Sequence, residues 1–246
     1  MKPNRRYESK QNELSSLVVP SLIVVAVAFF GLCLLLTASF ILLPPFQVMV
    51  QSRLNSLFGL NTVQIWWYAT RAAGLIAYLL LWFSTVWGLA VPSKLVSPLL
   101  EQTYTYDFHQ FISLLSIGFT ILHIIVLMVD QYLPFSIWQI LIPFIAPYRP
   151  FWVGIGVISF YIILLVTITF YLRSYIGMST FRYIHTFSLV GYLGATLHGL
   201  FTGTDGGLPG MQIIYLGSGL VVLILTAHWL WIRSLHKPNP QGSAAR

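Results

Sequence analysis

Apolar residues along this chain fall into six long blocks, each of about twenty residues or more. A helix that rises 1.5 Å per residue crosses roughly 30 Å of hydrocarbon in about twenty residues, so each block is long enough to span a membrane. None of the blocks alternates with the period of two that membrane β-strands show. The pattern predicts an all-α integral membrane protein, a six-transmembrane-helix bundle with spans at residues 17–43, 72–91, 108–129, 151–172, 183–202 and 211–232.

The composition supports a membrane location. Hydrophobic residues make up 57% of the chain and charged residues only 8%, against about 25% charged in globular proteins. The first block is about twice as long as the apolar region of a signal peptide, so we expect it to remain as an uncleaved anchor. The predicted organisation is an N-terminal tail (1–16), a transmembrane domain (17–233) and a C-terminal tail (234–246).

Lysine and arginine are distributed unevenly between the two sides. With the N-terminus inside, ten of them fall in the inner segments and three in the outer segments. Positive charge gathers on the cytoplasmic side of membrane proteins, so we expect both termini in the cytoplasm and a multi-pass protein of the bacterial inner (plasma) membrane. No basic cluster is interleaved with stacking aromatic residues on a soluble domain, which argues against nucleic-acid binding. The lipid bilayer is therefore the first predicted partner.

Two connections bear on the architecture. The outer segment 130–150 is too apolar to be a free loop and too short to span, so we expect it to lie along the outer surface or to cap the bundle. The inner segment 173–182 is short and basic, and it offers a docking surface to an acidic partner.

Four histidines stand inside two of the predicted spans. His109 and His123 are 14 residues apart in the third span, and His185 and His198 are 13 apart in the fifth. Ionisable residues within a membrane are costly, so they mark functional sites by default, and neutral imidazole is a usual axial ligand of haem iron. The two spans run in the same direction, which places His109 and His185 near the inner face and the other two nearer the outer face. Two such pairs at matched depth predict two stacked b-type haems.

The helical repeat adds a condition. A 14-residue step returns to within about 40° of the same helix face, whereas a 13-residue step misses it by roughly 140°. We therefore expect the fifth helix to be overwound or kinked between its histidines, and Gly191 and Gly194 lie in that interval. Structural histidines, or a metal other than haem iron, remain alternatives. For His228 we expect a structural or ligand-supporting role, and for His236 a solvated place in the tail.

The motifs His109-x13-His123 and His185-x12-His198 resemble those of the ferric reductase-like transmembrane domain family. That family includes ferric reductases, the membrane half of NADPH oxidases and the haem-binding subunit of the bacterial methionine sulfoxide reductase system. Residues 69–74, 147–152 and 197–205 are also similar to bacterial members, and the resemblance runs from the first span to the sixth. It implies that the four histidines ligate two haems and that electrons flow from the cytoplasmic haem to the outer one.

The resemblance also draws attention to charged residues beside the spans. Arg71 is expected at the outer start of the second span, where it pairs with an outer-haem propionate or reaches the outer headgroups. Arg182, three residues before His185, is a candidate partner of an inner-haem propionate or a simple marker of the inner side. Asp205, on the outer side, supplies protons, binds a cation or belongs to a turn.

Three functions remain open at the level of the sequence. The first is the membrane component of a ferric reductase-like oxidoreductase, which takes electrons from a cytoplasmic flavoprotein reductase or from quinol. Its acceptor would be ferric iron, oxygen or a periplasmic redox protein. No Gly-x-Gly-x-x-Gly motif follows a strand, so flavin or nicotinamide is expected only through a partner. The second is a quinone-linked cytochrome b subunit with a quinone site that involves His228. The third is a haem-free membrane protein whose histidines are structural or relay protons.

Overall fold

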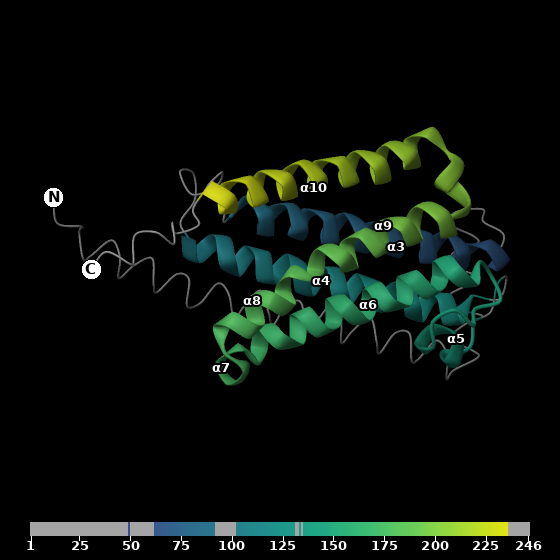
Figure 1. Ribbon diagram of the computed structural model, residues 1–246. Helices are drawn as coiled ribbons and strands as arrows, with labels where there is room; N and C mark the ends of the chain where they lie inside the picture. Colours follow the sequence, from purple (N-terminus) through teal and green to yellow (C-terminus); the bar gives the residue numbers. More distant parts are fainter. Residues whose placement is uncertain (1–48, 50–61, 92–101, 131–132, 134, 236–246) are drawn as a thin grey trace, which may run out of the picture.

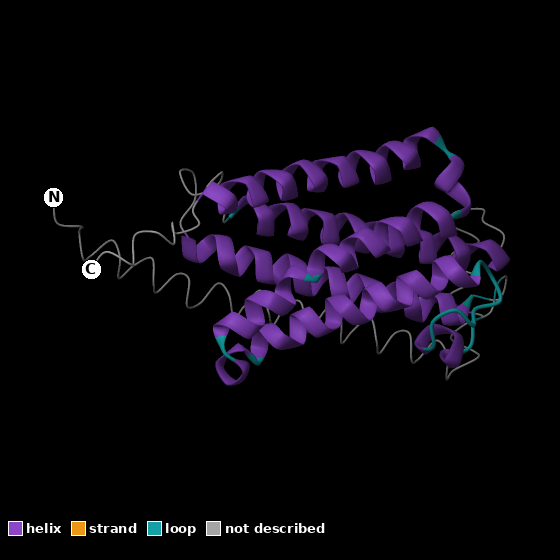
Figure 2. Cartoon of the chain, in the orientation of Figure 1, coloured by secondary structure: helices purple, strands orange, loops and turns teal. Residues whose placement is uncertain are grey.

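The computed structural model describes residues 49, 62–91, 102–130, 133 and 135–235, and all regular elements in these ranges are helices (Figures 1 and 2). The first predicted span, the N-terminal tail and His236 lie outside the described residues. Four helices are long and apolar enough to cross a membrane: Trp66–Ala90, Thr105–Val129, Pro150–Tyr171 and Pro209–Ser234. The prediction of an all-helical membrane protein is confirmed to that extent.

These four helices correspond to the second, third, fourth and sixth predicted spans. Their full bounds are α3 Thr62–Ala90, α4 Gln102–Val129, α6 Pro150–Tyr171 and α10 Pro209–Leu235. The helix α3 begins ten residues before the predicted span, so Arg71 lies within the helix and not at its start. Hydropathy detects only the apolar part of a helix, while hydrogen bonding continues into the polar interface.

The fifth predicted span is divided into two helices, α8 (Met178–Thr186) and α9 (Ser188–Thr202). The division falls at Phe187, whose N–H donates to the carbonyl of Ile184, three residues back, at 3.0 Å. Such a bond tightens the turn relative to the four-residue spacing of an α-helix. The predicted distortion between the two histidines of this span is therefore confirmed.

The glycines that the sequence suggested for this distortion serve helix packing instead. A Cβ at Gly191 would lie 2.7 Å from Cδ1 of Ile163, and one at Gly194 would meet Oγ of Ser159. Both neighbours belong to α6. The missing side chains let α9 approach α6 closely, as small residues do at helix interfaces in membranes.

Short elements close the two ends of the bundle. One end, here called the α5 end, carries α5 (Ile137–Leu141) and the 3-10 helix η1 (Thr204–Gly207); the opposite, α7 end carries α7 (Arg173–Ile176) (Figure 1). The segment before α6 packs on it through buried Phe135 and Ala146. This segment caps the bundle, as the sequence predicts for residues 130–150.

The long helices pack in a defined order. The helix α3 lies against α4, α6 lies against α9, and α10 contacts both α3 and α9 (Figure 1). At the junction of α3, α9 and α10 the buried hydroxyl of Tyr78 lies 3.1 Å from that of Tyr192, 3.2 Å from Thr196 and 2.6 Å from Ser218. Polar contacts of this kind hold helices together where the surroundings are as apolar as the side chains.

Candidate functional site

Two histidines meet at the α7 end of the bundle. His109 comes from α4 and His185 from α8, and the centroids of their rings are 6.1 Å apart with the planes at 78°. An imidazole nitrogen ligates a metal such as zinc at about 2.0–2.1 Å and the ring centroid lies roughly 1.2 Å behind it, so two rings on opposite sides of one ion have centroids about 6.4 Å apart. The observed spacing is therefore close to that of two imidazoles that share one metal ion.

Hydrogen bonds around His109 determine which of its nitrogens is free. Ser113 donates its hydroxyl proton to the carbonyl of His109 at 2.7 Å. Ser84, 2.7 Å from the Ser113 hydroxyl, therefore donates to it and can accept from Nδ1 of His109 at 3.2 Å. A neutral imidazole carries one proton, so Nε2 of His109 keeps its lone pair for a metal.

His185 lacks an equivalent contact. Its Nδ1 is buried and has no hydrogen-bond partner among the described residues. The ring packs against Phe181 at a centroid distance of 5.2 Å. The two ligand candidates at the α7 end thus differ, because one ring is fixed by a hydrogen bond and the other only by packing.

The other two histidines lie toward the α5 end. Nδ1 of His123, on α4, is 2.8 Å from the carbonyl of Thr70, and Nδ1 of His198, on α9, is 3.0 Å from the carbonyl of Trp152. A carbonyl can only accept, so both rings carry their proton on Nδ1 and leave Nε2 free.

Three glycines on neighbouring helices face these rings. A Cβ would lie 2.9 Å from the ring of His123 at Gly74, 3.0 Å from that of His109 at Gly88, and 2.5 Å from that of His198 at Gly156. Real side chains do not approach so closely, so glycine is required for the rings to stand where they do. The lack of a Cβ lets each imidazole pack directly against the neighbouring helix, which fixes where the ring stands.

This pattern leaves a trace in the sequence that histidine spacing alone did not reveal. Gly74 and Gly88 are 14 residues apart on α3, and His109 and His123 are 14 apart on α4. The two helices run antiparallel, so Gly74 faces His123 and Gly88 faces His109. Matching the two 14-residue intervals would have identified α3 as the helix that packs against both histidines of α4. No comparable signal points to Trp152, because its contribution is a backbone carbonyl.

The structure pairs Arg71 with Asp205 of η1 in a salt bridge. The guanidinium also lies 5.5 Å from the centroid of the Trp67 ring. Asp205 lies in the short 3-10 helix η1, in agreement with its interpretation as a turn residue. Its carboxylate pairs with the guanidinium of Arg71. Arg182 is exposed on α8. A contact between either arginine and a haem propionate stays a prediction.

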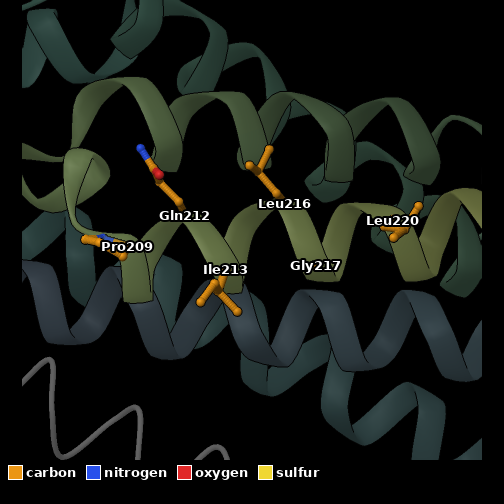
Figure 3. A pocket seen from close by; sticks show the side chains of 6 residues that line it. All are labelled: Pro209, Gln212, Ile213, Leu216, Gly217 and Leu220. Carbon is orange, nitrogen blue, oxygen red and sulfur yellow. The ribbon is translucent and has the colours of Figure 1, made fainter.

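The remaining polar candidates lie apart from the histidine pairs. His228 is exposed on α10. A groove of about 450 Å³ follows the outside of the same helix (Figure 3) and is lined by Pro209, Gln212, Ile213, Leu216, Gly217 and Leu220. None of these residues is one of the four histidines. Within the described ranges, no three His, Cys, Asp or Glu side chains gather around one point.

No protein-family model, no curated protein and no solved structure matches this chain. Its function is therefore inferred from its own residues and their geometry.

Proposed function

We propose that this protein is a di-haem b electron-transfer protein of the membrane, the membrane component of a ferric reductase-like oxidoreductase. One haem iron would be held by His109 and His185 and a second by His123 and His198. Electrons would enter on the cytoplasmic side from a flavoprotein reductase or from quinol and leave to an acceptor on the outer side. The proposed six-helix bundle consists of the four long helices, the α8–α9 segment and the predicted first span.

The observation that carries the proposal is the state of the ring nitrogens. Three of the four imidazoles place Nδ1 against an acceptor that fixes the proton there, and this leaves Nε2 as a lone-pair donor. Hydrogen bonds of this type orient metal-ligating histidines and raise their basicity. Structural histidines have no need of a free Nε2 on three rings.

When bound, the haems supply reversible one-electron chemistry. The chain would contribute two imidazoles to each iron, which would leave no ligand position for a substrate, so the final acceptor would be reduced without binding to the metal. The chain has a single cysteine, so a Cys-x-x-Cys-His attachment site is ruled out and the haems would be held without covalent bonds.

A haem count tests the proposal. The dithionite-reduced minus oxidised visible spectrum and the pyridine haemochrome are recorded for the purified wild type, His123→Ala and the matched control His228→Ala. We expect close to two b haems per chain in the wild type and in the control, and one in His123→Ala. Since His228 is exposed, its loss removes a histidine without touching either pair.

Other outcomes would favour the competing functions. A wild type free of haem after expression with sufficient haem supply would overturn the proposal and leave structural or proton-relay histidines. Loss of haem in the His228→Ala control would point instead to a site that includes α10. Haem reduction by quinol that quinone-site inhibitors block would identify the donor as membrane quinol and not a flavoprotein.

A further inference from the structure

His198 is held by the first turns of α6. Its Nδ1 donates to the carbonyl of Trp152, and the Trp152 ring stacks on the ring of Phe201 with centroids 4.2 Å apart and planes at 22°. Phe201 lies three residues after His198 in α9. Trp152 thus contacts His198 through its carbonyl and the next turn of α9 through its indole. The direction of the His198 imidazole therefore depends on how α6 and α9 pack together.

Arg149 holds α6 and α9 together. It is the residue before α6, and its guanidinium donates to the carbonyl of Phe201 in the last turn of α9. Carbonyls in the last turn have no partner within their own helix, so an arginine at this position is well bonded. The contact runs from α6 to α9, whereas the bond from His198 to Trp152 runs from α9 to α6.

The backbone at Arg149 has an unusual conformation for a residue with a side chain. Its φ is 41° and its ψ is 58°, in the left-handed region that favours glycine or asparagine. The next residue is Pro150, and a residue before proline prefers an extended conformation. Arginine stands here at some conformational cost, which is characteristic of positions where the surroundings over-determine a strained residue.

We propose that Arg149 is a positioning residue for His198, and that it sets the angle at which this imidazole meets the iron at the α5 end. This inference rests on the proposed function. It assigns to Arg149 a role in the properties of one haem and none in those of the other, because its contacts belong to α6 and α9 at the α5 end.

The chain offers a matched control at the opposite end. Arg173 donates to the carbonyl of Phe170 at 2.7 Å and lies 4.0 Å from the centroid of the same ring. Arg149 likewise combines a carbonyl bond with an aromatic contact, since its guanidinium lies 5.2 Å from the centroid of the Tyr148 ring. The carbonyl partner of Arg173, however, is a residue three positions earlier in its own segment. Removal of Arg173 should leave the angle of His198 unchanged, because its contacts lie at the α7 end, where Phe170 packs on Phe181 and Phe181 on His185.

The test compares the full-length variants Arg149→Gly, Arg149→Lys and Arg173→Gln with the wild type. The low-spin EPR signal of the oxidised protein, its redox midpoint potentials and the rate of haem loss to apomyoglobin are measured. The signal of the haem at the α5 end is identified as the one that His123→Ala lacks. Glycine tolerates the left-handed backbone, so Arg149→Gly removes the guanidinium while relieving strain, and thermal unfolding checks that it folds.

We expect Arg149→Gly to shift the α5-end signal and its potential and to release that haem roughly 10-fold faster, as loss of a ligand-supporting contact does. Arg149→Lys, which can still donate to the carbonyl, should recover part of the shift, and Arg173→Gln should leave the α5-end signal as in the wild type. An unchanged α5-end signal in both Arg149 variants, or an equal change of that signal in Arg173→Gln, would overturn the role of Arg149 while the two haems stand. A wild type without haem would overturn the proposed function, and this role with it.

Discussion

Substitution of Gly156 by alanine is the sharpest test of where His198 stands. The new Cβ would lie 2.5 Å from Nδ1, 2.7 Å from Cγ and 2.8 Å from Cε1 of that ring. Non-bonded carbon atoms prefer separations of about 3.5–4.0 Å, so the ring has to move by roughly 1 Å. A displacement of that size lengthens the 3.0 Å bond to Trp152 beyond hydrogen-bond range if the ring moves away from the carbonyl.

The energetic and the functional effects of this change differ in size. Overpacking costs about 1–3 kcal/mol, while alanine in place of a helical glycine returns about 1 kcal/mol. The net loss in the free energy of unfolding is therefore about 0–2 kcal/mol, which leaves the protein folded. The imidazole, however, no longer points its Nε2 as before, so we expect the haem at the α5 end to be lost or strongly perturbed.

A graded series with a control makes the outcome decisive. At Gly74 and Gly88 the nearest ring atoms would be 2.9 and 3.0 Å away, so alanine there should disturb His123 and His109 less than it disturbs His198 at Gly156. At Gly219 nothing lies within 4 Å, so Gly219→Ala should leave both haems unchanged. Haem content and the EPR spectrum are measured for all four variants. Two normal haems in Gly156→Ala, or a stronger effect at Gly219, would refute the arrangement of His198 against α6.

Three further predictions concern other contacts. Tyr78→Phe removes up to three interhelical hydrogen bonds and should lower the free energy of unfolding in detergent by about 2 kcal/mol, at roughly 0.6 kcal/mol per bond; an unchanged value would show that the hydroxyl is not bonded. A double-mutant cycle on Arg71→Gln and Asp205→Asn should give a coupling energy below about 1 kcal/mol, since both side chains are partly exposed; a larger one would mean a drier site. Because Nδ1 of His185 has no partner among the described residues, we expect carbon monoxide to displace this ligand first, visible as a difference spectrum in the reduced protein that survives in His123→Ala; a spectrum lost in that variant would contradict it.

The sequence predicts the long helices well and the polar contacts poorly. Runs of apolar residues locate α3, α4, α6 and α10, because the length of hydrocarbon to be crossed leaves few alternatives. The start of α3 was misplaced, since the helix begins before the apolar part, at Thr62. The pairing of Arg71 with Asp205 was not foreseen either. These two residues are far apart in the chain, and only the packing of α3 beside the turn after α9 brings them together.

Backbone groups account for most of what the sequence could not reveal at the site. The carbonyls of Thr70 and Trp152 orient two histidines, yet any residue type at either position offers a carbonyl. Glycine is different, because a position without a side chain can be recognised in the sequence. The place of Gly74 opposite His123 gives a steric reason for glycine there.

The break between α8 and α9 at Phe187 agrees with the distortion that the histidine spacing predicts. The 13-residue step between His185 and His198 is incompatible with one straight helix that aims both rings at one partner helix. In the structure His185 lies on α8 and His198 on α9. Between the two helices, the N–H of Phe187 donates to the carbonyl of Ile184, three residues back. A structural role would not require that the two rings face the same helix, whereas two haems clamped between α4 and the α8–α9 segment would. The di-haem proposal requires a distorted helix for a 13-residue spacing, and the interruption at Phe187 lies between His185 and His198.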